Sequence, residues 1–510
     1  MRFGTGAFST SSRSSSSRLV HCAVAAVAAV AAPCRAAAPA AGGRQAELAA
    51  RKQDMQADVA SLRKRLDRVP ASIDKVRVEL KKVAAAKGMN PTGIIFGPAV
   101  AVEALSENRK FDVGDGNAFD SLTAFSRDLQ QRGVDLMVVP YPSHAEVYGH
   151  RLVKGVKPED ELWPAKIEGI IKLLENDVEV VEVGDAFKSY KGPGHVLGSF
   201  DHHFDAAGID IIAKELARRI RKRYDFAKEA AAGQKQFTRQ QVQLPTPKFF
   251  LQYNGISADE AKPLNIPPTL TFEEVSFAGP VDLGKRIDPV FLMGDSSVPF
   301  AGVYPKGAGI MPHLSAELGW LVPYTSDHWG AHKQCAWYAR QHAQTLPQPR
   351  VLIVVMVGYS LYFNEAFLGK WSIAPLPPLP PPAEANGNKT SAAPSGGKPF
   401  RAVVTLTKVS TPPDPKKTPY KEAYTVSEAE VTELLEDVEG MAVGDTILLV
   451  EWAMKDRKVL PAATRLRSGL TRTVGLTRWE KQINASDKDT RMIMDETENY
   501  DAAMYWVGDP

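Results

Sequence analysis

The sequence predicts an α/β domain built on a central parallel sheet, followed by a small β-rich module. Two observations carry this prediction. Between residues 90 and 372, short apolar runs alternate with amphipathic stretches of helical spacing, the pattern of strand–helix–strand units in a parallel sheet. Beyond a proline-rich linker at residues 373–399, short β-branched runs separated by Pro- and Gly-rich turns fill residues 400–510.

Composition narrows the class of protein. The chain has 510 residues, enough for two or three domains, and 44% of them are hydrophobic, as in ordinary globular proteins. Its 62 basic and 59 acidic residues leave a formal charge of +3. So small a surplus over this length gives no indication of a nucleic-acid partner.

Residues 1–42 have the composition of an export segment. Three arginines lie among serines, and an apolar, alanine-rich run follows at residues 19–32. This order is typical of a signal peptide, so we expect a periplasmic or secreted protein. An uncleaved N-terminal anchor is the alternative, although the run is short for a membrane span. After cleavage Cys335 would be the one cysteine left, which excludes an internal disulfide.

Residues 43–89 are predicted to be helical. Apolar side chains recur at helical spacing from Leu48 to Leu66, within a stretch rich in charged residues, and Pro70 marks the end of this helix. A second helix is expected over residues 73–86. The pair can form a helical hairpin or coiled coil, through which the chain would oligomerise, or it can pack on the main domain; the sequence leaves both open.

The elements of the main domain follow from periodicity. Its predicted helices cover residues 119–132, 163–176, 206–224, 312–318 and 330–341, and its predicted strands cover residues 134–140, 178–183, 289–293 and 351–357. The last strand is a continuous apolar run, which is typical of a strand buried on both faces. In the C-terminal module, strands are expected at residues 401–409, 446–452 and 471–476.

The strand at residues 289–293 runs directly into Gly294-Asp295-Ser296-Ser297. A serine at such a junction can act as a nucleophile if a histidine takes its proton and a carboxylate orients that histidine. Asp201-His202-His203 supplies both groups. In an extended turn, the side chains of Asp201 and His203 project to one side while His202 points away. The sequence therefore indicates acyl-transfer chemistry, with the Ser296 backbone N–H as an oxyanion donor.

Each motif also has a simpler interpretation. A strand-ending Asp-Ser is often a turn or a helix cap, and Asp205 is placed to be the N-cap of the helix that follows the histidine motif. Asp201, His202 and His203 are all residue types that bind metal ions. The chain offers few further ligands at short spacing, so no metal or other cofactor is expected.

A family resemblance links these motifs. Val138-Val139-Pro140-Tyr141-Pro142-Ser143-His144-Ala145-Glu146-Val147-Tyr148 precedes Asp201-His202-His203-Phe204 and Gly294-Asp295-Ser296-Ser297, and the segment 307–319 follows them. In this order they resemble the AlgX/AlgJ-type alginate (exopolysaccharide) O-acetyltransferases, which are SGNH-hydrolase-like proteins. The resemblance implies a three-layer SGNH-hydrolase-like fold over residues 90–372. The histidine block precedes the serine block, a circularly permuted order relative to ordinary SGNH hydrolases.

Carried over residue by residue, the resemblance implies Ser296 as nucleophile, His203 as general base and Asp201 as its orienting carboxylate. Ser297 and Tyr304 are implied as oxyanion- or substrate-binding residues. This sequence departs from the family pattern in having His144 where the family usually has lysine, Phe204 in place of tryptophan, and Ser297 in place of an aromatic residue.

The resulting hypothesis is an exported O-acetyltransferase that moves acetyl through a serine acyl-enzyme to hydroxyls of an extracellular polysaccharide. The resemblance also implies a membrane O-acyltransferase that delivers the acetyl donor. Two alternatives remain open at this point. An esterase or deacetylase would use water in place of the sugar hydroxyl, and a non-catalytic scaffold would bind the polysaccharide without turnover.

Overall fold

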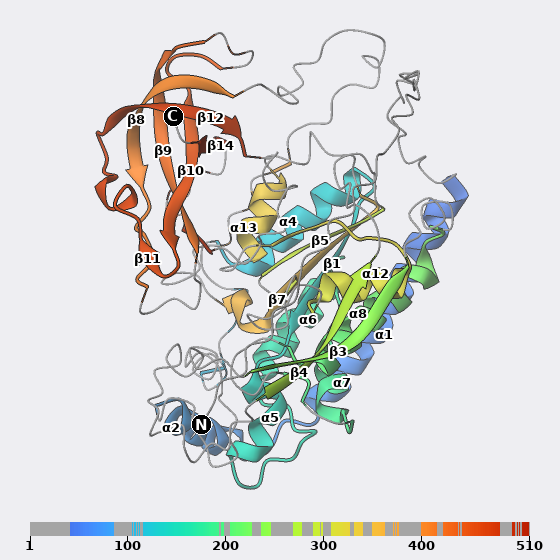
Figure 1. Cartoon of the computed structure of the whole chain (residues 1–510). Helices are drawn as coiled ribbons and strands as arrows, with labels where there is room; N and C mark the ends of the chain where they lie inside the picture. The colour runs from blue at the N-terminus through green and yellow to red at the C-terminus, as the bar shows by residue number, and fades with distance from the viewer. Residues whose placement is uncertain are drawn as a thin grey trace, which may run out of the picture.

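The computed structural model shows an α/β domain with a C-terminal β-barrel beside it (Figure 1). It describes residues 41–85, 105, 107–108, 110, 112, 116–192, 195–197, 204–226, 236–245, 269–277, 289–295, 297–298, 308–326, 331–339, 349–362, 371, 373, 375–376, 399–415, 422–436, 438, 441–479, 492–494, 497, 499 and 502–508. No helix within these ranges is both long and apolar enough to cross a bilayer.

A five-stranded parallel sheet forms the centre of the α/β domain, in the order β2-β1-β7-β5-β6. The strands are β1 (Asp135–Tyr141), β2 (Glu179–Val180), β5 (Val290–Gly294), β6 (Tyr324–Ser326) and β7 (Val351–Val357). The middle strand, β7, is buried along its whole length because strands flank it and helices cover both faces. The predicted parallel sheet is therefore confirmed.

Two strands differ from the sequence prediction. The strand expected at residues 178–183 pairs over Glu179 and Val180 alone, because β2 is an edge strand that leaves the sheet after Val181 donates to the Val138 carbonyl. The other edge strand, β6, was not predicted. Its three residues, Tyr-Thr-Ser, are too few and too polar to give a hydrophobic pattern.

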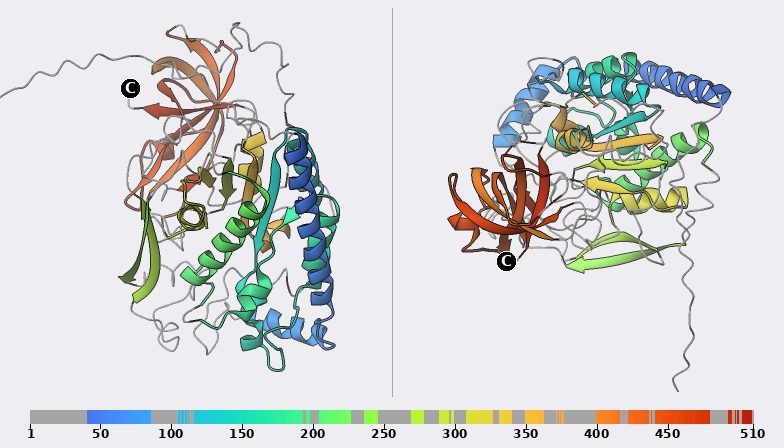
Figure 2. Two further views of the ribbon diagram at one scale, coloured as in Figure 1. Left: turned by 90° about the vertical axis from the view of Figure 1, so that its right-hand side faces the viewer. Right: turned by 90° about the horizontal axis from the view of Figure 1, so that it is seen from above.

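Helices cover both faces of the sheet, which gives the three layers that the view from above shows (Figure 2). The chain moves outward from β1 to β2 and in the opposite direction from β2 to β5, and right-handed crossovers then place the intervening helices on opposite faces. Accordingly α8 packs against α12, and α4 packs against α6. The domain's helices are α4 (Ala118–Gln131), α5 (His144–Leu152), α6 (Pro164–Glu175), α7 (Gly184–Ser189), α8 (Ala206–Arg223), α12 (Ile310–Leu318) and α13 (Ala331–Trp337).

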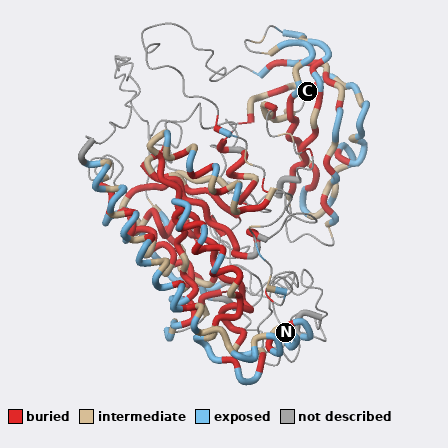
Figure 3. The backbone as a smooth tube through the Cα atoms, turned by 180° about the vertical axis from the view of Figure 1, so that it is seen from behind, coloured by how far each residue is buried: buried red, intermediate tan, exposed pale blue. Residues whose placement is uncertain are grey.

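The N-terminal helices α1 (Ala41–Leu66) and α2 (Ile73–Ala85) pack on this domain. Met55 and Leu62 of α1 and Leu80 of α2 are buried in the same hydrophobic core as the sheet. Of the two alternatives that the sequence left open, the structure shows the packed one. Burial is continuous from α1 through the sheet, while the outer side of α1 is exposed (Figure 3).

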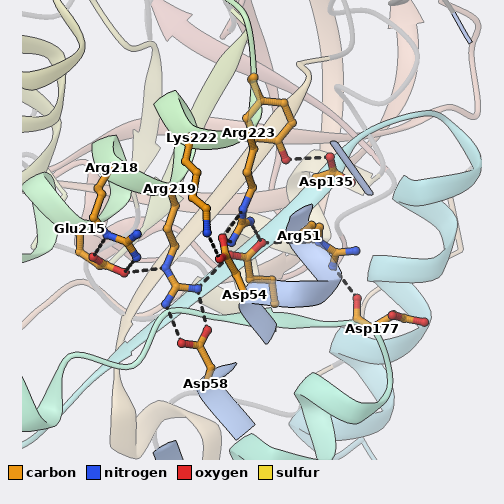
Figure 4. A network of polar contacts seen from close by, with 12 residues as sticks. Arg51, Asp54, Asp58, Asp135, Asp177, Glu215, Arg218, Arg219, Lys222 and Arg223 are labelled. Atoms are coloured by element: carbon orange, nitrogen blue, oxygen red, sulfur yellow. Dashed lines mark hydrogen bonds and ion pairs between the residues drawn. The ribbon is translucent and has the colours of Figure 1, made fainter. Parts of the chain in front are cut away.

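Ion pairs hold α1 against α8 (Figure 4), and Arg51 of α1 also pairs with Glu179 of β2. Asp58 pairs with Arg219 at 2.8 Å and Asp54 with Arg223 at 2.7 Å. The buried Glu179 of β2 pairs with Arg219 at 3.1 Å and with Arg223 at 2.5 Å. We call this group the α1–α8 charge cluster; its members are Arg51, Asp54, Asp58, Glu179, Arg219, Lys222 and Arg223.

An antiparallel pair of strands, β3 (Phe237–Pro245) and β4 (Thr269–Phe277), packs outside α8 and α12. Arg239 of β3 pairs with Glu273 of β4 at 2.8 Å and with Glu317 of α12 at 2.6 Å. The second contact anchors the strand pair to the domain. The sequence analysis missed this pair. Most side chains of β3 are polar and exposed, so its sequence has no clear alternation of apolar and polar residues.

The C-terminal module is a small β-barrel, which confirms the predicted β-rich class. Its order is β11-β10-β14-β12-β8-β9-β13, and a further pairing of β10 with β9 closes the barrel. Closure removes exposed sheet edges. The strands are β8 (Phe400–Val409), β9 (Ala423–Leu434), β10 (Thr446–Lys455), β11 (Lys458–Val459), β12 (Thr471–Arg478), β13 (Met492–Met494) and β14 (Ala503–Gly508).

Candidate active site

The candidate site lies at the carboxyl edge of the parallel sheet. Strands β1, β7 and β5 end there side by side, and the chain leaves β1 toward β2 but leaves β5 toward β6. Ligands of open α/β sheets bind at such topological switch points. The Gly294 backbone lies so close to β7 that a Cβ at this position would clash with the Val355 carbonyl oxygen, so the sequence needs glycine here.

Asp295 organises the turn that follows β5. One carboxylate oxygen accepts a hydrogen bond from the Ser297 N–H at 2.9 Å, and the other accepts from the Val357 N–H, also at 2.9 Å. The first contact shapes the turn and the second ties it to the end of β7. The two residues on either side of Ser296 in the chain are therefore held in place. Ser296 itself lies outside the residues that the structure describes.

Tyr141, the last residue of β1, joins this turn from the side. Its hydroxyl lies 2.7 Å from the Ser297 Oγ and 3.4 Å from Asp295 Oδ2, and all three side chains are buried. The Ser297 hydroxyl and backbone N–H are thus both engaged within the protein. These contacts fix the shape of the turn. The role of Ser297 in binding an oxyanion or substrate stays a prediction.

Phe204, the residue after His203, packs against the same tyrosine. Asp201, His202 and His203 lie outside the described residues, but Phe204, which follows them, is buried with its ring centroid 4.1 Å from that of Tyr141. Phe204 also forms an antiparallel bridge with Leu197. One residue later, Asp205 accepts a hydrogen bond from the Ala206 N–H at 2.8 Å, which confirms that it is the N-cap of α8.

Tyr141 therefore contacts Phe204, which follows His203, and Asp295, which precedes Ser296. These two residues are 91 positions apart in the chain. Tyr141 belongs to the first sequence motif, but no role was predicted for it. The available signal was a hydroxyl that follows five apolar residues at the carboxyl end of a fully buried strand, where a polar atom must find a partner.

A buried ion pair supports the loop after β1. Lys166 Nζ lies 2.6 Å from Glu146 Oε1, and both side chains are almost completely buried. The second Glu146 oxygen accepts from the Ser143 N–H at 2.7 Å, so one carboxylate fixes both the start of α5 and the position of Lys166. His144, which stands where the resembling family has lysine, is buried with its ring 6.0 Å from that of Tyr148.

The described part of the chain contains no group of three or more His, Cys, Asp or Glu side chains arranged to hold a metal ion. Tyr304, predicted to bind the oxyanion or substrate, lies outside the described residues. What the structure positions is the surroundings of the proposed triad: the turn on each side of Ser296, and the segment that follows His203.

Comparisons with known proteins agree with the sequence analysis. Residues 101–353 match the model of the SGNH hydrolase-like domain of the acetyltransferase AlgX. No curated protein matches the chain. Among solved structures, the O-acetyltransferase domain of Pseudomonas putida AlgJ is 20% identical, with 53% of this chain and 88% of that chain covered and a TM-score of 0.39.

Two further solved structures are similar. Pseudomonas aeruginosa AlgX is 14% identical, with 78% of this chain and 85% of that chain covered and a TM-score of 0.38. Bacillus cereus PatB1 is 12% identical, with 51% and 94% covered and a TM-score of 0.31. Through residues 101–353, the chain belongs to the family of SGNH hydrolase-like acetyltransferase domains.

Proposed function

We propose that the protein is an exported O-acetyltransferase that acetylates hydroxyl groups of an extracellular polysaccharide. The family supplies the reaction class. The structural observation that supports it is the position of Tyr141, which contacts Ser297 and Asp295 beside the proposed nucleophile and Phe204 beside the proposed base. The acetyl donor, in this proposal, is delivered by a membrane O-acyltransferase.

The proposed reaction has two steps. In the first, the Ser296 Oγ attacks the acetyl carbonyl while His203 takes the serine proton, and the donor's leaving group departs with that proton. In the second, a sugar hydroxyl attacks the acyl-enzyme, gives its proton to His203, and releases Ser296, which recovers its proton. Asp201 keeps the His203 ring in the tautomer that both steps need.

Transfer and hydrolysis can be separated by the fate of the acetyl group. The purified protein is given an activated acetyl ester with and without an oligosaccharide acceptor, and acetylated sugar and free acetate are both measured. We expect acetylated sugar to dominate when the acceptor is present. Acetate alone would assign the chain to the esterases, and sugar binding without either product would make it a scaffold.

Variants of the histidine motif provide a matched control. Ser296→Ala and His203→Ala are each expected to lower acetyl transfer by at least about a thousandfold, because the triad acts as a unit. His202→Ala is expected to keep a rate near that of the wild-type protein, since its side chain should point away from the serine. Full activity in folded Ser296→Ala protein would refute the proposal.

A further inference from the structure

A basic cavity lies beside the candidate active site. It has a volume of about 80 Å³ and opens between α5, α7 and the chain that follows α7. Five of its lining side chains are basic residue types: His150, Arg151, Lys188, Lys191 and His195. None of the residues that line it is acidic. We call this space the basic cavity.

The charges at its mouth are not neutralised within the described part of the chain. Arg151 lies over the Tyr148 ring, 5.0 Å from the centroid, and neither Arg151 nor Lys191 forms an ion pair with a described residue. Lys188, deeper in the wall, lies 3.5 Å from Glu161 and donates to the Asp160 carbonyl at 2.8 Å. Arg151 and Lys191 thus line the cavity without a carboxylate partner among the described residues.

The neighbouring histidines respond to these charges. Burial lowers the pKa of His150, and Arg151, Lys191 and Lys188 lower it further. Burial and Arg151 lower the pKa of His195 in the same direction. Burial and the nearby cations thus favour the neutral form of both rings. A neutral ring has one N–H donor; that of His150 is in a hydrogen bond with the Val147 backbone, so His195 is the histidine that can donate to a ligand. Gathering like charges in this way costs free energy that a bound anion would recover.

Size restricts what the cavity can hold. By the same measure of volume a water molecule needs about 10–15 Å³, so the basic cavity has room for a handful of heavy atoms. A carboxylate or a tetrahedral oxyanion fits this space, whereas a whole sugar ring does not. The donors around it are those that proteins use for such groups, namely guanidinium, ammonium and imidazole N–H.

The cavity is joined to the candidate active site through Tyr148. The hydroxyl of this lining residue accepts hydrogen bonds from the backbone N–H groups of Val196 at 3.1 Å and Leu197 at 3.4 Å. Leu197 is bridged to Phe204, which directly follows the histidine motif. A group bound in the cavity would thus lie near Leu197 and Phe204, the described residues between which the proposed base stands in the sequence.

We propose that the basic cavity is a binding subsite for the anionic group, a carboxylate or a phosphate, of a charged acceptor polysaccharide. The identity of the acceptor rests on the proposed transferase function, but the binding of an anion does not. An acceptor anchored by this group would present a hydroxyl on a neighbouring part of the same sugar chain to the carboxyl edge of the sheet.

Sulfate is a suitable first probe because it keeps its charge across neutral pH. Its affinity is measured by titration calorimetry for the wild-type protein, Arg151→Gln, Lys191→Gln and the double variant. We expect sulfate to bind the wild-type protein and to bind the double variant at least about tenfold more weakly. Arg465→Gln and Lys458→Gln, exposed positions on the barrel, serve as controls of equal charge change and should bind like the wild-type protein.

The absence of sulfate binding, or equal binding by wild-type and double-variant proteins, would overturn the site. The acceptor role is tested by transfer to a carboxylate-bearing oligosaccharide and to a neutral one. In Arg151→Gln, KM should rise for the charged acceptor alone, with little change in kcat, and sulfate should compete with the charged acceptor alone.

If the variants lose sulfate affinity while KM for the charged acceptor stays the same, the cavity binds a free anion and the acceptor role is wrong. If neither oligosaccharide is acetylated by the wild-type protein, the proposed transferase function fails, and the sulfate measurements still decide whether the cavity binds anions. The two failures are therefore distinguishable.

Discussion

The α1–α8 charge cluster and the basic cavity both gather cations in the same domain, but they differ in what surrounds those cations. In the cluster, Arg51, Arg219, Lys222 and Arg223 each lie within 4 Å of a carboxylate. In the cavity, Arg151 and Lys191 have no acidic partner among the described residues. The paired charges hold a helix in place, whereas the cavity cations, which lack an acidic partner in the described part of the chain, are the ones that we propose bind a ligand.

The largest expected effect comes from breaking the charge cluster at its centre. Glu179 is fully buried and contacts three arginines, so Glu179→Gln leaves them with one carboxylate fewer. We expect a loss of about 3–5 kcal/mol in the free energy of unfolding, because uncompensated buried charge is costly. Urea denaturation measures this loss.

The control is Glu175→Gln, which removes an exposed pair with Arg63 and should cost less than about 1 kcal/mol. Equal, small losses for both variants would show that the cluster does not stabilise the fold.

Acid should break a second ion pair that holds α1, the buried pair of Arg65 with Glu161, in a defined pH range. Glu161 is fully buried; burial alone would raise its pKa, but Arg65 and Lys188 hold that pKa at about 2. A depressed carboxyl pKa contributes stability above the unfolded value of 4.5, and this contribution is lost as the pH falls from there toward 2. Wild-type unfolding free energy should therefore drop more steeply over this range than that of Glu161→Gln. Parallel pH profiles for the two proteins would contradict the assignment.

Tyr141→Phe tests an uncharged buried contact at the site. The change leaves the buried Ser297 hydroxyl without its tyrosine partner, at a cost of about 1–3 kcal/mol. It also loosens the turn around Ser296, so we expect kcat for acetyl transfer to fall about tenfold or more with KM little changed. Tyr338→Phe alters another buried tyrosine of this domain and should keep kcat. A Tyr141→Phe protein with wild-type kcat would show that the Tyr141 hydroxyl does not contribute to acetyl transfer.

The smallest effect on stability is expected in the basic cavity. Arg151→Gln removes an exposed charge that has no acidic partner in the described part of the chain, so the unfolding free energy should change by no more than about 0.5 kcal/mol in the absence of anions. Added sulfate should then raise the melting temperature of the wild-type protein more than that of the variant, because binding stabilises the folded state. A large loss of unfolding free energy in Arg151→Gln would show that Arg151 stabilises the fold, as the arginines of the α1–α8 charge cluster do.

The sequence predicted the elements whose pattern is local and apolar. Two elements have the predicted bounds to within one residue: the strand at residues 351–357 and the helix that begins after Asp205. The first is marked by a continuous apolar run and the second by a helix cap, and both signals can be recognised in a short stretch of sequence. The edge strand β6 and the polar strand β3 were missed because pairing partners distant in the chain, not their own pattern, make them strands.

The motifs of the candidate site could be recognised in the sequence, but the contacts that hold the residues around them in place could not. Gly294 and Asp295 were recognised as part of a strand-to-turn junction, yet nothing in the sequence shows that Asp295 reaches Val357 or that Tyr141 meets Ser297. The basic cavity was missed for the same reason. Arg151 and His195 lie far apart in the chain, and the fold alone brings them to one cavity.

The central claim, that Ser296 carries the acyl group, has a direct test. The protein is incubated with an activated acetyl ester without an acceptor, quenched, digested and analysed by peptide mass spectrometry. The account predicts one acetyl group on the peptide that contains Ser296, absent in Ser296→Ala and removed when an oligosaccharide acceptor is added before quenching. An unmodified Ser296 peptide from folded protein that still transfers acetyl would contradict it.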